Sequence, residues 1–218
     1  MAHVIPFHGT LYNPATVGDV RQVVAPPYDI IDATLQKTLH DRHPNNVIRL
    51  ELGYEQPGDT TGDNKYLRAA GALKEWLKSG ALRRDDKPAI YYHTIEYQPP
   101  YSAPGTPTKV FKGFLSTVEL EEFGSGKIYP HENTRAAAKT DRFNLLEACR
   151  ANFSAIISLY SDPQNDVLTL IERSIASDKP RIDFQDDVGF RQRLWSVTDP
   201  AVLAKVVKIM HTKQLFIA

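Results

Sequence analysis

Two segments rich in β-branched and aromatic residues, 89–97 and 109–120, constrain the fold of this chain more than any other feature. Residues of these types favour strands, because they pack well on a pleated surface. A proline-rich run, PPYSAPGTP, separates the two segments and indicates a loop. The segments therefore predict a β-hairpin with a long connection. That connection, residues 98–108, is also the candidate for a boundary within an otherwise single domain.

Helices and strands alternate irregularly along the rest of the chain. A capping residue followed by apolar residues at helical spacing indicates each helix, as in the segment between Asn64 and Gly80. Asp199 and Pro200 begin the last helix, as cap and first helical residue. Helices are predicted at 31–43, 64–79, 140–152, 165–176 and 199–210, and strands at 46–52, 154–160, 178–184, 190–199 and 215–218. This irregular order predicts an α+β fold over residues 1–218, with a mixed sheet and flanking helices.

Composition and charge exclude several classes of protein. The 218 residues include 26 Lys and Arg and 26 Asp and Glu, so no overall field attracts nucleic acid or an anionic membrane. The chain shows no signal peptide and no apolar run of about 18 residues, the length that a membrane helix needs. Its single cysteine, Cys149, cannot form an intramolecular disulfide. These features predict a cytoplasmic protein without a membrane partner.

The stretch His131–Tyr160 combines charge with a helix start and is the first candidate for a functional site. Thr140 is a good N-cap, and Asp141 falls in the first turn, where the helix dipole favours an anion. Free backbone N–H groups at a helix start also bind anionic ligands. The alternative is a solvated surface with ion pairs worth about 0–1 kcal/mol each. The charged residues at the start of the stretch are His131, Glu132, Arg135, Lys139, Asp141 and Arg142.

The same stretch carries an apolar stripe after its charged start. Phe143, Leu146 and Cys149 recur at three-residue spacing, and Leu145 widens the stripe. We therefore expect this face of the helix to pack on a core, with Leu146 at a central position. Arg142 is expected to be exposed for ligand binding. The segment SAIISLY, residues 154–160, has the pattern of a short buried strand.

A second candidate site lies in VVAPPYDII, residues 23–31. Its two prolines hold the backbone extended and deliver Tyr28 and Asp29 at a fixed place. An aspartate before a helix is often a cap or a turn former. The competing interpretation is a carboxylate that a rigid loop presents to a substrate hydroxyl or a metal.

Five segments of the chain, taken together, resemble a known family. They are IPFHGTLYNP, VAPPYDII, KVFKGFLSTVEL, HENTRAAAKTDRFNLLEACRANFSAIISLY and the final KQLFIA. In this order they are similar to the prokaryotic domain-of-unknown-function family ten-fifteen, over nearly the whole chain. That family is grouped with the ParB/sulfiredoxin-like superfamily, whose relatives include the free-serine kinases. The resemblance implies a fold that is ParB/sulfiredoxin-like in part.

Members of the family look as though they continue, after the strand that matches LFIA, into a motif of the DGHHRYETA type. In the superfamily, a comparable strand–turn–helix segment contributes to nucleotide phosphate binding, as an anion at a helix start would. The present chain ends one residue before such a motif. The resemblance therefore implies the N-terminal portion of a longer protein, with a fold that is incomplete at the C-terminus and no activity by itself.

The resemblance also implies an activity for the full-length protein: a nucleotide-dependent kinase or phosphohydrolase of small molecules such as amino acids, with ATP or ADP and Mg²⁺ as candidate cofactors. Phosphoryl transfer needs mainly positive charge around phosphate oxygens and a base for the acceptor hydroxyl. Asp29 and Glu132 are the candidate catalytic residues, as base or metal ligand. The candidates for binding substrate or phosphate are Tyr28, His131, Asn133, Thr134, Lys139 and Arg142, with the positive charge coming from Lys139 and Arg142.

Two other classes of function stay open. One is a ParB-like regulatory or nucleic-acid-linked binding module without catalysis, and the other is a ligand-binding or interaction domain. The zero net charge and the lack of a helix with clustered Lys and Arg argue against nucleic acid. We therefore expect the partner to be a small-molecule substrate or a nucleotide. The sequence leaves the metal and the oligomeric state open.

Overall fold

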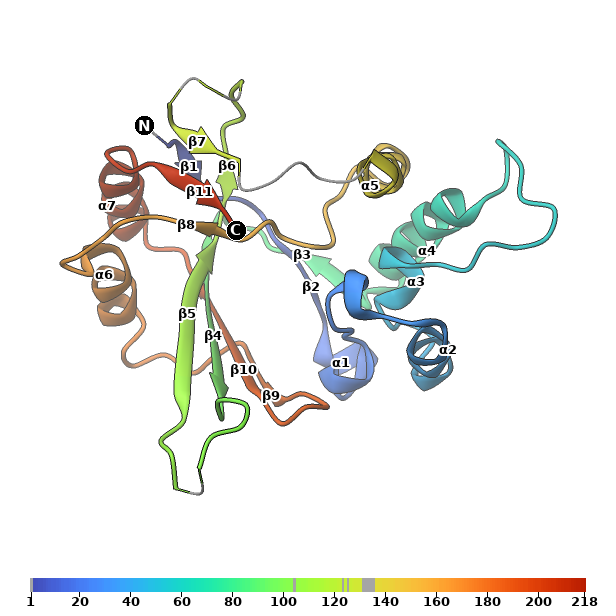
Figure 1. The fold of residues 1–218 in the computed structure, drawn as a ribbon, viewed down its shortest axis with the longest axis horizontal. Coiled ribbons are helices and arrows are strands. Elements are labelled where there is room, and N and C mark those ends of the chain that lie inside the picture. Colours follow the sequence, from blue (N-terminus) through green and yellow to red (C-terminus); the bar gives the residue numbers. More distant parts are fainter. Residues whose placement is uncertain (1, 104, 123, 125, 131–135) are drawn as a thin grey trace. The chain divides into compact units, whose positions relative to one another are not determined.

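The chain forms two compact units that are interleaved in sequence (Figure 1). A computed structural model describes residues 2–103, 105–122, 124, 126–130 and 136–218. Unit 1 comprises Met1–Gly9, Asp85–His131 and Ile156–Ala218, and unit 2 comprises Thr10–Arg84 and Glu132–Ala155. The connection 98–108 lies inside unit 1, where it joins two strands of one sheet.

A four-stranded antiparallel sheet organises unit 1. Strand β5 (Lys109–Leu115) pairs along its whole length with residues 91–97 of strand β4 (Ile90–Tyr97), which confirms the predicted hairpin. Strands β9 (Ile182–Gln185) and β10 (Arg191–Val197) complete the sheet in the order β5-β4-β10-β9. The two later strands also occur where the sequence predicts them.

The core of unit 1 lies between this sheet and two helices, α6 (Asp166–Ser174) and α7 (Pro200–Met210). The Asp199 side chain accepts hydrogen bonds from the N–H groups of Ala201 and Val202, so α7 begins as predicted. Large apolar side chains from the helices and from the sheet are buried together, among them Ile90, Tyr92, Val167, Ile171, Val206 and Met210.

Short strands complete unit 1. Strand β11 (Leu215–Ile217) pairs in parallel with β7 (Ile128–Tyr129) and antiparallel with β8 (Ser158–Leu159), and β1 (Val4–Ile5) pairs with β6 (Thr117–Val118). The predicted final strand is therefore confirmed. With antiparallel and mixed sheets beside helices, the fold belongs to the α+β class.

The prediction of a buried strand at 154–160 is wrong in its burial. Only Ser158 and Leu159 form a strand there, and Ile156 and Ile157 are 75% and 58% exposed. Strand β8 pairs with β11 alone and so lies at a sheet edge. An apolar run can therefore precede an edge strand without entering the core.

Gly9 packs directly against a tyrosine in unit 1. Its N–H donates to the Tyr91 hydroxyl at 2.7 Å, and a Cβ atom at position 9 would lie 2.5 Å from the Tyr91 ring. We expect Gly9→Ala to lower the free energy of unfolding by about 1–3 kcal/mol, because the ring or the backbone must move. Gly71→Ala is the control, since nothing lies within 4 Å of a Cβ atom there.

Gly71 lies inside a helix, where alanine is favoured over glycine by about 1 kcal/mol, so this control should raise stability slightly. Urea denaturation of the two variants measures the difference. Equal midpoints would show that Gly9 does not pack on Tyr91 in this way.

Unit 2 is mostly helical. Its strands are β2 (Thr10–Tyr12) and β3 (Leu82–Arg84), which pair with each other. Its helices are α1 (Pro14–Val17), η1 (Val20–Gln22), η2 (Tyr28–Ile30), α2 (Ala33–Arg42), α3 (Ile48–Glu51), α4 (Lys65–Ser79) and α5 (Ala136–Cys149). Trp76 of α4 packs in its core with Val17, Val23, Leu50, Ala81 and Leu82.

Helix α4 forms where the sequence predicts it. The Asn64 side chain accepts hydrogen bonds from the N–H groups of Tyr66 and Leu67. Gly80 ends the helix with a φ of 78°, a left-handed conformation that glycine adopts without strain. Local signals at both ends are thus sufficient to place this helix.

The prediction of a strand at 46–52 is wrong, because residues 48–51 form the short helix α3. Asn46 is fully buried, and its side-chain amide donates to the carbonyl oxygens of Gln22 and Val24. Its side-chain oxygen accepts from the N–H of Ile48. These bonds turn the backbone at Asn46, so tertiary contacts override the alternating pattern.

Two predictions about α5 are also wrong. Its described part begins at Ala136, and the Thr140 hydroxyl donates to the Ala136 carbonyl instead of capping the helix. Leu145 is buried at 6% exposure, whereas Leu146 is 41% exposed and Phe143 is 61% exposed. Helix α5 packs against α4, and of the predicted stripe only Leu145 is buried.

Candidate functional site

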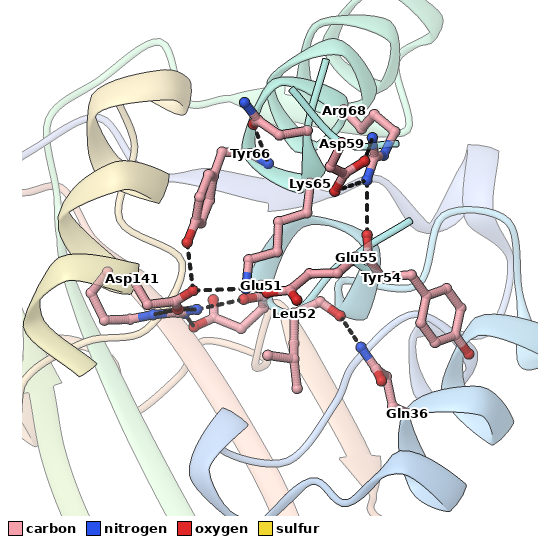
Figure 2. Close-up of polar contacts among 12 residues, drawn as sticks. Gln36, Glu51, Leu52, Tyr54, Glu55, Asp59, Lys65, Tyr66, Arg68 and Asp141 are labelled. Carbon is pink, nitrogen blue, oxygen red and sulfur yellow. Dashed lines mark hydrogen bonds and ion pairs between the residues drawn. The ribbon is translucent and has the colours of Figure 1, made fainter. Parts of the chain in front are cut away.

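Six side chains of unit 2 form one connected cluster of charges and aromatic rings, which we call the Arg142 cluster. They come from η2, α3, α4 and α5. Figure 2 shows the polar contacts around Glu51, Lys65, Tyr66 and Asp141. The members of the cluster are Tyr28, Glu51, Lys65, Tyr66, Asp141 and Arg142.

Arg142 joins α5 to the end of α3. One terminal nitrogen of its guanidinium donates to the Glu51 carboxylate at 2.6 Å, and the other donates to the Glu51 backbone oxygen at 3.0 Å. Glu51 is only 6% exposed and also accepts from the Ser154 hydroxyl at 2.8 Å. The guanidinium carbon lies 4.3 Å from the centre of the Tyr28 ring. The Arg142 guanidinium is therefore held in two ways, by charged hydrogen bonds to Glu51 and by stacking on the Tyr28 ring.

Asp141 is the point at which two cations meet. Its carboxylate accepts from Lys65 at 2.9 Å, from the Tyr66 hydroxyl at 2.8 Å and from the Nε of Arg142 at 3.0 Å. Burial raises the pKa of Asp141, but the hydrogen bonds from Arg142, Lys65 and Tyr66 outweigh it and lower the pKa to about 2. The carboxylate stays ionised above that pH, and its contribution to stability is lost as the pH falls from about 4 toward 2.

The connection between α3 and α4 is tied to the same cluster. Lys65 also contacts Glu55 at 3.0 Å. Farther along, Arg68 donates to both oxygens of Asp59 and to the backbone oxygen of Tyr54, and Gln36 donates to the backbone oxygen of Leu52 (Figure 2). These bonds hold the connection at several points along its length.

The space beside the cluster is small. Its volume is about 10 Å³, room for about one water molecule. Glu51, Lys65, Tyr66 and Arg142 line it together with Leu50, Leu52, Gly53 and Leu145. A larger ligand must therefore bind on the outer side of the cluster or displace some of its internal contacts.

A wider groove of about 440 Å³ lies in unit 1 at the ends of β4 and β9. Its charged side chains are already paired within the sheet: Arg191 forms two hydrogen bonds with Asp183, and Arg193 contacts Glu96 at 2.9 Å. None of the residues that the sequence singles out lines this groove. We therefore place the candidate site at the Arg142 cluster.

The structure brings together two of the predicted site residues, Tyr28 and Arg142, from segments more than 100 residues apart in sequence. Asp29 is exposed and is the neighbour of Tyr28. Lys139 is also exposed and lies three residues before Arg142 on α5, a spacing that puts the two cations on one side of a helix. The other predicted residues, His131, Glu132, Asn133 and Thr134, lie outside the described residues.

The expectation that Arg142 is exposed is wrong, because 24% of its side chain is accessible and its guanidinium is bound on two sides. Sequence reasoning also missed Glu51, Lys65 and Tyr66. The one local signal for Glu51 is an acidic residue inside the apolar run IRLEL. Lys65 and Tyr66 carry no such signal, since charged and aromatic residues are common in the first turn of a helix.

Two further features are absent from the described residues. Nowhere among them do three or more His, Cys, Asp or Glu side chains gather closely enough to hold a metal ion. In the same part of the chain, none of the helices has the length and apolar character that crossing a membrane requires.

Comparison with known proteins gives one result. No curated protein matches this chain, and no solved structure does. A family model described as "Protein of unknown function (DUF1015)" matches residues 4–218, nearly the whole chain. On that match, this chain belongs to the DUF1015 family of proteins of unknown function.

Proposed function

We propose that this chain belongs to a cytoplasmic, nucleotide-dependent kinase or phosphohydrolase of small molecules, related to the ParB/sulfiredoxin-like superfamily. In this proposal the outer side of the Arg142 cluster holds the phosphate groups. The observation that carries it is the gathering of cations: Lys65 and Arg142 both contact Asp141, and Lys139 lies on the Arg142 side of α5.

The state of each cation supports this assignment. Lys65 and Arg142 are held in place by carboxylates, so they are positioned before a ligand arrives. Lys139 is exposed, and within the described part of the chain it has no hydrogen-bond or ion-pair partner. A bound phosphate group would provide Lys139 with such a partner. Charge-assisted hydrogen bonds of this kind contribute about 1.5–3 kcal/mol each.

The carboxylates divide into two roles. Asp141 accepts hydrogen bonds from three side chains and its pKa is lowered to about 2, so it is a poor proton acceptor at neutral pH and is suited to orienting the cations. Asp29 is exposed beside Tyr28, whose ring stacks on Arg142, and it is the described candidate for the base that accepts a proton from the acceptor hydroxyl. Positioning and positive charge carry most of phosphoryl transfer, so few other groups are needed.

Lys139→Ala tests the proposal, because this exposed side chain can be removed without unfolding the protein. Titration of ¹⁵N-labelled protein with ADP and Mg²⁺ should give saturable shifts in the amide signals of residues 136–142 and of Lys65. The variant should bind about tenfold more weakly, the effect of losing about 1.4 kcal/mol. Lys78→Ala is the matched control, since Lys78 is an exposed lysine near the C-terminal end of α4.

The control should bind as the unchanged protein does. If ADP produces no saturable shifts around α5, or if Lys139→Ala and Lys78→Ala bind ADP equally well, the cluster does not hold phosphate and the proposal is wrong.

A further inference from the structure

His40 is a buried histidine next to the candidate site. It lies on α2 at 8% exposure, and its ring stacks on Tyr54 with 4.1 Å between ring centres and 21° between ring planes. Its Nε2 atom is buried and has no hydrogen-bond partner among the described residues. Tyr54 itself is 40% exposed, so the stack covers the histidine from the solvent side.

A cation lies beside this ring. Arg49 of α3 donates from its guanidinium to the backbone oxygen of His40 at 2.7 Å, and its Nε is buried without a partner among the described residues. On α2 itself, Asp41 is the nearby acid, and Lys37 already engages it. Burial and the Arg49 charge lower the pKa of His40, against smaller opposing effects of the Leu52 backbone and Asp41. This environment thus favours the neutral form of the His40 ring over the protonated form.

The stack holds one end of the connection that joins α3 to α4. This connection follows Glu51 and leads to Lys65, both members of the Arg142 cluster. Tyr54 lies at its beginning, two residues after Leu52, which accepts a hydrogen bond from Gln36 of α2 (Figure 2). Movement of Tyr54 away from α2 would therefore loosen the connection between Glu51 and Lys65, and the distance between these two residues would be less well fixed.

We propose that His40 is an acid-sensitive latch: its neutral ring holds Tyr54 and the start of the α3–α4 connection against α2, and uptake of a proton releases them. The added charge would lie beside Arg49 in a site with little water, which is unfavourable until the ring leaves it. The consequence for the candidate site is weaker phosphate binding at low pH, and that consequence rests on the proposed function.

The direction of the effect follows from proton linkage. In the latched state the pKa of His40 is lowered, so the ring stays neutral to a lower pH. In the released state the ordinary histidine pKa of 6.5 applies. Below pH 6.5 the released state therefore binds more protons, and release becomes more favourable as the pH falls. One pH unit below that value, the equilibrium constant for release should rise by up to about tenfold.

Amide hydrogen exchange at residues 52–64 measures the release directly. After correction for intrinsic exchange rates, protection in this segment should fall by up to about tenfold between pH 7.5 and pH 5.5. His40→Phe keeps a flat ring for the stack and cannot take up a proton, so its protection should not depend on pH in this range. His3→Phe, at an exposed histidine of unit 1, should retain the full pH dependence.

A second variant keeps the test decisive if His40→Phe folds poorly. Tyr54→Leu removes the stack, so protection of residues 52–64 should be lower than in the starting protein and should be the same at both pH values. A pH dependence that survives in His40→Phe or in Tyr54→Leu would overturn the latch, as would unchanged protection in the starting protein at pH 5.5.

The same variants separate the latch from the proposed function. Affinity for ADP with Mg²⁺ should fall between pH 7.5 and pH 5.5 more in the starting protein than in His40→Phe, and this comparison cancels protonation of the nucleotide itself. Equal falls in the two proteins would overturn the regulatory consequence. A failure of ADP to bind at either pH would overturn the proposed function, while the exchange measurement would still decide the latch.

Discussion

Replacing Arg142 by alanine is expected to lower the free energy of unfolding by about 3 kcal/mol. The change leaves Glu51, at 6% exposure, without the cation that balances its charge, and removal of one partner from a buried ion pair costs about 3–5 kcal/mol. We expect a loss at the lower end of this range because 24% of the Arg142 side chain is accessible to solvent. Loss of the stack on Tyr28 acts in the same direction.

Urea denaturation measures this effect, and two further variants identify its cause. The double variant Glu51→Gln, Arg142→Ala should lose less stability than Arg142→Ala alone, because a neutral amide is buried in place of a charge. Lys139→Ala should change stability by under about 0.5 kcal/mol, as expected for an exposed side chain. A loss below about 1 kcal/mol in Arg142→Ala would mean that water reaches Glu51 and that the pair is a surface contact.

Leu145→Ala is expected to destabilise the protein by about 2–4 kcal/mol, because it removes a buried side chain from the face that α5 packs on α4. Its neighbour Leu146 is 41% exposed, so Leu146→Ala should cost under about 1 kcal/mol. The two substitutions remove the same atoms from adjacent positions, and denaturant midpoints compare them directly. A larger loss of stability in Leu146→Ala than in Leu145→Ala would show that Leu146 is the central packed position of α5, as the sequence pattern predicts.

Elements with strong local signals could be predicted from the sequence. Helix α4 has Asn64 at one end and Gly80 at the other, and α7 has Asp199 as its cap. The β4–β5 hairpin follows from β-branched and aromatic residues on both sides of a proline-rich loop. In each case the residues that determine the element lie within it or next to it in sequence.

Elements determined by distant contacts could not be predicted. Residues 48–51 alternate like a strand, but the buried Asn46 binds the backbone of residues 22 and 24 and turns the chain into a helix. The predicted stripe on α5 is only partly correct, for a related reason. Phe143, Leu145 and Leu146 are all apolar, and only the contact with α4 decides which of them is buried.

The candidate site likewise contains residues that could be predicted from the sequence and contacts that could not. Tyr28 could be singled out because the prolines before it stiffen the loop, and Arg142 because it lies in a charged stretch. Their stacking joins segments more than 100 residues apart, which no local pattern encodes. Glu51 was missed because its role depends on a helix that the sequence pattern predicts as a strand.

A crystal structure of the 218-residue chain bound to ADP and Mg²⁺ would show directly whether the Arg142 cluster holds phosphate. We expect phosphate oxygens within hydrogen-bonding distance, about 2.7–3.2 Å, of the Lys139 ammonium and of Arg142 or Lys65. Phosphates bound elsewhere, for example in the groove of unit 1 that Asp183 and Arg191 line, with Lys139 free in solvent, would contradict it.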